Sequence, residues 1–354
     1  MNEQIDIVPL GRKELRGLDV DVLKSDLAAL WREAGGGSEK SAVSRACHAT
    51  LVIPARLDES VDDRVLEIIQ AHPSRVILVR DDPSRDPGDV EAWVSASCTR
   101  RPGSGSLVCS ESVHIVAGPD TERQVASAIR SLAIGGLPVI ILSESVSPLE
   151  VPWVSRLEGV SDLVIGDSER MSVAGGVEFW RRIAADQGAT GYRDLQWARL
   201  IDWRRAIASW FDRREEKTSL RAIRSATVTI ADCSGGRLKA RLLFGWLGSR
   251  LGWSVEGDVT MTTRQLEGSE DAAMIHSVTF EFAGDRPRLC WRRLASEQAI
   301  VIEEGKDSRL LFRLNQTKTD RRGAVVSMIQ RYGSGIVARE AMGFACLLGE
   351  RSGD

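Results

Sequence analysis

Residues 49–80 read ATLVIPARLDESVDDRVLEIIQAHPSRVILVR, and this stretch decides the fold class of the N-terminal half. Ala49–Pro54 is a short apolar run, and Ser60 can cap a following helix whose apolar residues share one face. His72-Pro73 ends that helix, because proline disfavours helical geometry in the residue before it. Arg75–Arg80 is a second apolar run without alternation, which is typical of a strand covered on both faces. The stretch therefore predicts a strand, a helix and a strand in succession.

The same alternation continues along the N-terminal half. Val90–Cys98 and Val108–Val116 are typical of a pair of half-buried strands joined by a turn-rich connection. Asp120 or Thr121 opens a second helix, and Thr121 with Gln124 forms a capping-box pattern. Leu137–Leu142 and Asp162–Ile165 complete the predicted strands. Together these segments predict an α/β domain with a mixed sheet.

The C-terminal half has a different pattern. Leu195–Phe211 is a predicted helix, and the strand Ala226–Ala231 leads into a helix over Arg237–Leu251. Val337–Leu348 is the last predicted helix. Between them lie closely spaced strand-like segments: Trp253–Met261, Ile275–Phe282, Pro287–Arg293, Ala299–Glu304 and Arg309–Leu314. Their close spacing favours an antiparallel meander over crossover connections.

The length of 354 residues allows roughly two domains, at about 150 residues each. We expect residues 1–39 to form a lead-in with a helix over Asp19–Glu33. Residues 40–190 are then an α/β domain with a mixed sheet, and residues 191–354 an α+β domain with an antiparallel sheet.

Composition excludes several classes of protein. The 47 basic and 50 acidic residues leave a net charge of −3, which disfavours a general nucleic-acid binder. The longest apolar runs, such as Leu137–Leu142, are too short to span a bilayer, and Met1–Leu10 lacks the apolar segment of a secretory signal. We therefore expect a cytoplasmic protein without membrane or nucleic-acid partners. We also expect reduced thiols, without metal-binding spacing, at Cys47, Cys98, Cys109, Cys233, Cys290 and Cys346.

Motifs of catalytic chemistry are missing from the sequence. It has no G-x-S-x-G, no G-x-x-x-x-G-K and no H-E-x-x-H, and its histidines are scattered. Gly333–Ala338 matches the relaxed pattern G-x-G-x-x-A, which needs a preceding strand and an acidic residue about twenty positions later. Because so few residues follow Ala338, we expect a helix start there. The sequence thus predicts a protein that is not an enzyme, with no catalytic residues, no cofactor and no metal.

A first candidate site lies where predicted strands end, because open α/β sheets bind ligands there. Ser143, Asp167 and Ser168 occupy such positions and can line a crevice for a small molecule. Sugar phosphates or nucleotides would suit nearby helix N-termini, although the acidic residues disfavour strongly anionic ligands. The structural interpretation stays open, since Asp and Ser are common in any loop after a strand.

A second candidate site is the predicted helix Leu195–Phe211, whose tryptophans and arginines fall on two neighbouring stripes. In one interpretation the tryptophans fill the seam between the domains and the arginines pair with Asp194, Asp202 and Asp212. In the other, both residue types face a protein partner, where they commonly anchor interfaces. The residues assigned to partner contact are Trp197, Arg199, Trp203 and Arg204, with Arg237 and Arg241 as weaker additions.

Seven segments carry a family resemblance. They are His72–Ile77, Cys109–Val113, Gly136–Val139, Asp162–Ser168, Asp194–Leu200, Trp203-Arg204 with Phe211-Asp212, and Leu243–Trp253. In this order they resemble the glucose-6-phosphate dehydrogenase assembly protein family, OpcA. Residues 134–142 are less aromatic and less acidic than in the family, and Ser110 stands where a second cysteine often adjoins the one matching Cys109.

The resemblance implies a non-enzymatic partner of glucose-6-phosphate dehydrogenase that promotes its active oligomer or activates it allosterically in the oxidative pentose phosphate pathway. Binding the active state better than the inactive one is sufficient for this, and it requires no catalytic residue. The departure at Ser110 gives no basis for carrying over a redox pair of cysteines. The alternative function is a small-ligand sensor or a degenerate α/β enzyme that uses the strand-end crevice.

Overall fold

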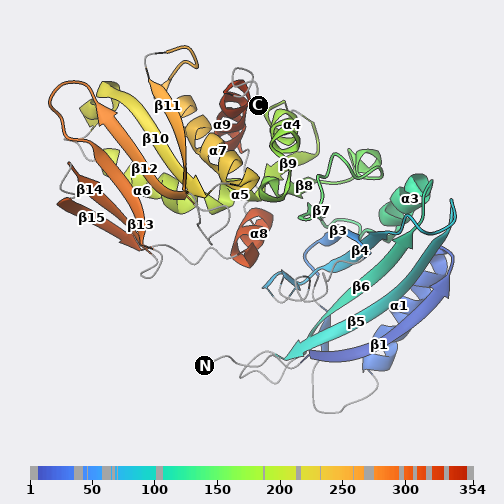
Figure 1. Cartoon of the computed structure of the whole chain (residues 1–354). Helices are drawn as coiled ribbons and strands as arrows, with labels where there is room; N and C mark the ends of the chain where they lie inside the picture. The colour runs from blue at the N-terminus through green and yellow to red at the C-terminus, as the bar shows by residue number, and fades with distance from the viewer. Residues whose placement is uncertain are drawn as a thin grey trace. The chain divides into compact units, whose positions relative to one another are not determined.

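The structure is a computed structural model. It describes residues 7–35, 43–45, 47–57, 65, 68–69, 71–100, 107–185, 188–212, 217–231, 233–257, 259–266, 275–294, 299–305, 309–315, 321–330 and 335–348. The chain divides into two compact units (Figure 1). The first unit is Met1–Gly166 with Gln187–Tyr192, and the second is Asp167–Asp186 with Arg193–Asp354. This division differs from the predicted ranges 40–190 and 191–354 mainly because the segment Asp167–Asp186 groups with the second unit.

The first unit is built on a mixed sheet with the strand order β1-β5-β6-β4-β3-β7-β8-β9. Five neighbouring strands run parallel, in the order β6-β4-β3-β7-β8, while β5 and β1 add an antiparallel edge. The mixed α/β sheet predicted from the sequence is therefore confirmed. The elements are β1 (Ile7–Arg16), α1 (Val20–Gly35), β2 (Val43–Arg45), β3 (Thr50–Arg56), β4 (Arg75–Asp81), β5 (Val90–Arg100), β6 (Leu107–Ala117), α3 (Glu122–Leu132), β7 (Val139–Ser143), η1 (Ser155–Leu157), β8 (Leu163–Gly166) and β9 (Gly191–Asp194), whose last two residues, Arg193 and Asp194, belong to the second unit.

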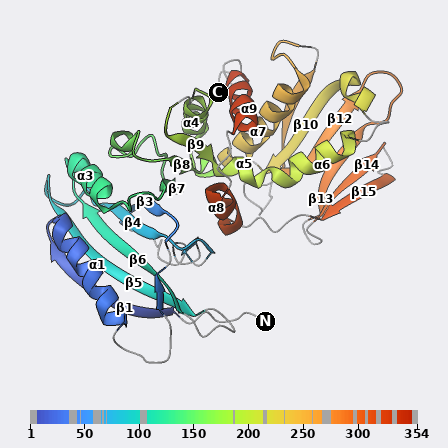
Figure 2. The ribbon, with the colours of Figure 1, turned by 180° about the vertical axis from the view of Figure 1, so that it is seen from behind.

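Burial explains why these strands form the centre of the first unit. β3, β4, β7 and β8 are buried along nearly their whole length, as their unbroken apolar runs predict. Helix α1 packs against β5 and β1 and also contacts α3 (Figure 2). The predicted helix after Ser60 lies mostly outside the described residues; within it, Val65, Ile68 and Ile69 are helical and buried.

Two details of the first unit differ from the predictions. The lead-in contains not only a helix but also the strand β1, which pairs with β5. The capping box at Thr121 is wrong, because the Thr121 hydroxyl donates to the carbonyl oxygen of Gly118 at 2.6 Å and caps no helix N–H. The preceding residue, Asp120, takes a left-handed φ of 62°.

The second unit contains a sheet with the strand order β11-β10-β12-β13-β14-β15. Its elements are η2 (Ser168–Arg170), α4 (Val173–Ala184), α5 (Leu195–Arg199), α6 (Ile201–Phe211), η3 (Lys217–Ala222), β10 (Ile223–Ala231), α7 (Ser234–Leu251), β11 (Thr260–Leu266), β12 (Ile275–Phe282), β13 (Leu289–Leu294), β14 (Ala299–Glu304), β15 (Arg309–Asn315), α8 (Arg321–Gln330) and α9 (Ile336–Leu347). The predicted antiparallel meander is confirmed for β12 to β15. It is wrong for β11, which pairs parallel with β10 because α7 forms a crossover between the two strands.

Close helix packing holds the second unit together. An added Cβ at Gly245 of α7 would lie 2.1 Å from the carbonyl oxygen of Ala341, and one at Gly248 would lie 2.4 Å from the ring of Phe344. Only glycine therefore allows α7 to approach α9 this closely. On the sheet side, the Trp291 indole of β13 donates to the Ala206 carbonyl oxygen of α6 at 3.1 Å.

Candidate functional site

A buried polar cluster lies within the second unit, centred on Asp194 at the end of β9. Asp194 is fully buried, and its carboxylate caps α5 by accepting from the Gln196 N–H at 3.0 Å. The same carboxylate accepts from the backbone N–H and the hydroxyl of Ser168, at 3.1 and 2.6 Å, and from the Trp180 indole at 2.6 Å. Burial raises the pKa of Asp194, and the hydrogen bonds from Ser168 and Trp180 oppose that rise.

The second half of this cluster is an ion pair between Arg199 of α5 and Asp167. Nη1 and Nη2 of Arg199 donate to the two carboxylate oxygens of Asp167 at 2.7 and 2.9 Å. Nη1 also donates to Glu169 at 2.9 Å, and the Lys239 ammonium lies 3.6 Å from the same Glu169 oxygen. Burial acts to lower the pKa of Arg199, but Asp167 and Glu169 outweigh it, so its net pKa is raised and the side chain stays charged.

The structure thus brings together residues that the sequence assigned to two different sites. Asp167 and Ser168, predicted for a ligand crevice, bond to Arg199 and Asp194, so their polar atoms are occupied inside the second unit. Ser143 lies in the first unit, where its hydroxyl donates to the Val146 carbonyl oxygen at 2.7 Å. The ligand role assigned to these residues stays a prediction.

The residues predicted for partner contact differ in how accessible they are. Trp203 is buried, with 5% of its surface exposed. Arg241 of α7 donates to the carbonyl oxygens of Ala345 and Cys346 at the end of α9, at 2.6 and 3.1 Å. Arg237 is exposed in the first turns of α7. The role of each in partner contact stays a prediction.

Trp197 and Arg204 form a half-buried pair across the break between α5 and α6. The predicted single helix is two helices that meet at Leu200, and this break places the Arg204 guanidinium 3.5 Å from the centre of the Trp197 ring. Nη2 of Arg204 donates to the Trp197 carbonyl oxygen at 2.9 Å. Its Nε is buried and has no hydrogen-bond partner among the described residues. Burial, together with the neighbouring Arg205 charge, lowers the pKa of Arg204 to about 10.

Sequence reasoning missed several members of the buried polar cluster: Glu169, Trp180, Gln196 and Lys239. The only local signal of the cluster is Asp194 itself, because aspartate is a common N-cap residue and Asp194 directly precedes α5. Trp180 and Lys239 come from α4 and α7, so only tertiary packing brings them to the cluster.

The cysteines differ in part from the expectation. Among the described residues no disulfide involves Cys47, Cys233, Cys290 or Cys346, whereas Cys109 is disulfide-bonded, so the expectation of six reduced cysteines is wrong at Cys109. In the β5–β6 register Cys109 stands opposite Cys98. Among the described residues no group of three or more histidine, cysteine or acidic side chains is placed to hold a metal ion. The helices in the described parts of the chain are all too short or too polar to cross a membrane.

Two solved structures are similar to this chain at very low sequence identity. The crystal structure of a probable oxidoreductase, yhhX, matches with a TM-score of 0.43 and 7% identity, over 86% of this chain and 97% of that one. An oxidoreductase from Sinorhizobium meliloti matches with a TM-score of 0.40 and 10% identity, over 85% of this chain and 89% of that one.

Two curated relatives from cyanobacteria share the name "Putative OxPP cycle protein OpcA". The relative in Nostoc punctiforme is 27% identical over 214 residues, which are 60% of this chain and 44% of the relative. The relative in Synechocystis is 25% identical over 196 residues, which are 53% of this chain and 39% of the relative. The match therefore spans less than half the length of either relative.

Two models of one family match consecutive parts of the chain. The model described as glucose-6-phosphate dehydrogenase subunit N-terminal domain matches residues 65–178, and the corresponding C-terminal domain model matches residues 190–339. Together the two matches cover well over half of the 354 residues, and the N-terminal domain model matches ahead of the C-terminal one. The chain belongs to the OpcA family of glucose-6-phosphate dehydrogenase assembly proteins.

Proposed function

We propose that this chain is a non-catalytic partner of glucose-6-phosphate dehydrogenase, which it binds and shifts towards the active oligomer. The observation that carries the proposal is the match to both domain models of a glucose-6-phosphate dehydrogenase subunit, over residues 65–178 and 190–339. A protein that binds the active assembly more tightly than the inactive one raises the active population without any chemistry of its own.

The Trp197–Arg204 pair is the part of the predicted contact surface that best suits a partner. Arg204 is partly desolvated, yet its Nε lacks a hydrogen-bond partner among the described residues. A carboxylate on the dehydrogenase would complete its hydrogen bonding, because a guanidinium matches a carboxylate in charge and shape. The Trp197 ring packs against the Arg204 guanidinium. Tryptophan and arginine are the residue types enriched at the energetic centres of interfaces.

Arg199, Arg241 and Trp203 have a different role in this proposal. Arg199 and Arg241 donate to groups of the same chain, and Trp203 is buried. We assign these three residues to holding α5, α6 and α7 in place, so that Trp197 and Arg204 are presented in a fixed geometry. Arg237, exposed on α7, stays a secondary contact.

The test uses the dehydrogenase from the same source. Its rate is measured at limiting glucose 6-phosphate while this chain is titrated in, and the mass of the mixture is measured by light scattering. We expect a rate that rises and saturates at a fixed stoichiometry, together with a larger particle that contains both proteins. An unchanged rate, combined with separate elution of the two proteins, would disprove the proposal.

A further inference from the structure

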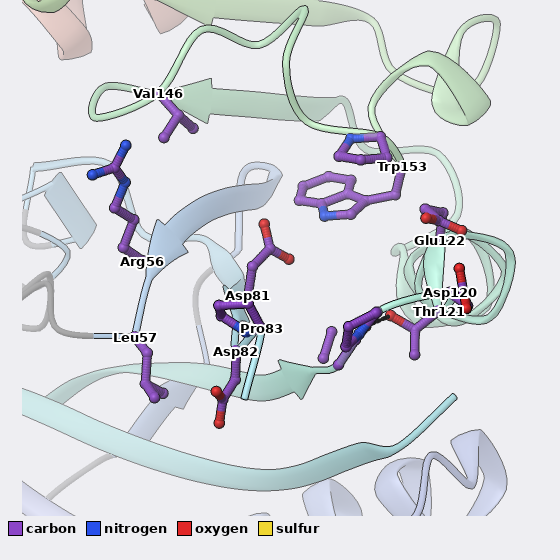
Figure 3. Close-up of a pocket in the computed structure, with 14 residues that line it drawn as sticks. Arg56, Leu57, Asp81, Asp82, Pro83, Asp120, Thr121, Glu122, Val146 and Trp153 are labelled. Atoms are coloured by element: carbon purple, nitrogen blue, oxygen red, sulfur yellow. Dashed lines mark hydrogen bonds between the residues drawn. The ribbon is translucent and has the colours of Figure 1, made fainter. Parts of the chain in front are cut away.

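A pocket of about 610 Å³ opens in the first unit at the carboxyl ends of its parallel strands (Figure 3). Its wall is formed by the ends of β3, β4 and β6, the start of α3 and the loop after β7. Strands β3 and β7 are neighbours although β4 and β6 intervene in the chain, so the strand order reverses here. Open α/β sheets bind ligands in the crevice at such a reversal, and the volume suits a small molecule.

Trp153, in the loop after β7, is the first sign that a ligand belongs in this pocket. The side chain is 2% exposed, and its indole nitrogen is buried without a hydrogen-bond partner among the described residues. In Figure 3 the ring extends into the pocket, with its nitrogen on the side of Asp81. Buried donors are nearly always paired in native proteins, so an acceptor supplied by a ligand would complete this site.

Asp81, the last residue of β4, is the second sign. Its carboxylate points into the pocket and receives no hydrogen bond from the described residues. The adjacent Asp82 differs, because the backbone N–H and hydroxyl of Ser84 donate to it at 3.0 and 2.5 Å. Partial burial and the nearby Glu122 raise the pKa of Asp81. In doubly wound sheets an acidic residue at the end of the second strand accepts hydrogen bonds from ribose hydroxyls, and β4 is the second of the five parallel strands described above.

The charge of the pocket selects against phosphorylated ligands. Asp81, Asp82, Asp120 and Glu122 line it against one basic residue, Arg56. The loop after β3 begins Pro54-Ala55-Arg56-Leu57 and lacks the glycines that let a backbone approach a pyrophosphate. Four carboxylates would repel a phosphate more strongly than the N-terminus of α3 would attract it. The remaining wall, which includes Trp153 and several prolines, is apolar and suits a flat base or the face of a sugar ring.

We propose that this pocket binds an uncharged small molecule through a pair of hydroxyl groups, as in a ribonucleoside or a free sugar. Asp81 accepts hydrogen bonds from the two hydroxyls, and the Trp153 indole donates to an oxygen or ring nitrogen of the same ligand. The site lies wholly within the first unit and does not depend on the dehydrogenase.

Calorimetric titration of the full chain with four probes tests the proposal. Adenosine and glucose are the uncharged probes, and adenosine 5′-monophosphate and glucose 6-phosphate are their phosphorylated counterparts. We expect one uncharged probe to bind at least about tenfold more tightly than its phosphorylated counterpart, and the identity of that probe distinguishes a nucleoside from a sugar. Equal or tighter binding of the phosphorylated probe would overturn the proposal, as would the failure of both uncharged probes to bind at millimolar concentration.

Three variants locate the binding. Asp81→Asn and Trp153→Phe should each lower the affinity for the uncharged probe by about tenfold, because each change removes one hydrogen bond to the ligand. Trp153→Phe breaks no hydrogen bond within the described protein, so its cost to folding is limited to the lost volume. Asp86→Asn is the matched control, since Asp86 is exposed in the same loop but does not line the pocket. Unchanged binding in Asp81→Asn, or equal losses in Asp86→Asn, would overturn the assignment even if Trp153→Phe failed to fold.

Discussion

The indole nitrogen of Trp180 donates a hydrogen bond to Oδ2 of Asp194 at 2.6 Å, and both side chains are completely buried. Trp180 lies on α4 and Asp194 caps α5, so this bond ties two helices of the second unit together. The same oxygen accepts from the Ser168 hydroxyl at 2.6 Å. A carboxylate is the only side chain of this size that can accept all of these bonds at once.

We therefore predict that Asp194→Asn lowers the free energy of unfolding by roughly 3 kcal/mol. An asparagine NH2 in place of Oδ2 would face the indole N–H of Trp180, and one in place of Oδ1 would face the backbone N–H groups of Ser168 and Gln196, so either orientation sets donor against donor. Urea unfolding followed by tryptophan fluorescence measures the change. Asp212→Asn, at the exposed end of α6, is the control and should leave stability unchanged. A stable Asp194→Asn protein would mean that the cluster tolerates a neutral amide.

The elements predicted correctly from the sequence are those whose local pattern matches their final surroundings. β3 and β4 are buried on both faces, and their apolar runs do not alternate. β11 shows the limit of this approach. Thr260–Leu266 is mostly exposed and pairs parallel to β10 only because α7 returns the chain to that edge, which no local pattern records.

The buried polar cluster shows the same limit for a site. The sequence identifies each of the three residues separately: Asp167 and Ser168 follow a predicted strand, and Arg199 lies on a predicted helix. Their meeting depends on β9, which returns the chain 26 residues after Ser168 and so places Asp194 against it. The sequence left Arg199 with two interpretations, pairing with an aspartate of the same chain or contact with a partner, and its guanidinium donates to Asp167, which is 2% exposed.

The ion pair between Arg199 and Asp167 yields a second prediction. Arg199→Ala leaves the buried Asp167 carboxylate without its bidentate partner and should cost roughly 3 kcal/mol of stability. The double variant Arg199→Ala/Asp167→Ala should lose about 2 kcal/mol less stability than the sum of the losses in the two single variants, because each single change already breaks the pair. Unfolding measurements on the wild type and the three variants give this coupling directly. Strictly additive losses would show that the two residues act independently.

A third prediction concerns partner binding by Arg204. Arg204→Gln should weaken binding to the dehydrogenase by about tenfold or more, because it removes the charge that a partner carboxylate would meet. The free energy of unfolding should change little, since the side chain makes one hydrogen bond, to the Trp197 carbonyl oxygen, and its Nε already lacks a partner among the described residues. Biolayer interferometry with immobilised dehydrogenase gives the affinity.

The control for Arg204 is its neighbour. Arg205→Gln removes the same charge from an exposed side chain of α6. It also relieves the repulsion that helps to lower the pKa of Arg204, so Arg204 stays fully charged at neutral pH. We expect Arg205→Gln to bind the dehydrogenase like the wild type. An equal loss of affinity in Arg204→Gln and Arg205→Gln would indicate that binding depends only on the overall charge of the two proteins. Unchanged affinity in both variants would show that the Trp197–Arg204 pair is not part of the interface.

The last prediction uses pH to separate function from stability at Asp81. Its pKa is raised above the ordinary 3.8, so the folded state binds this proton more tightly than the unfolded chain does. The stability that protonated Asp81 gives the folded state is complete below pH 3.8 and is lost as the pH rises through the higher pKa of the folded state. At neutral pH the ionised Asp81 carboxylate is therefore less favourable in the folded state than in the unfolded chain. Asp81→Asn should therefore raise the thermal midpoint at pH 7 relative to wild type, and this advantage should shrink as the pH falls towards 4. If Asp81→Asn is more stable than the wild type but binds the uncharged probe less well, Asp81 serves the ligand rather than the fold. If Asp81→Asn is less stable than the wild type at pH 7, Asp81 is a structural residue.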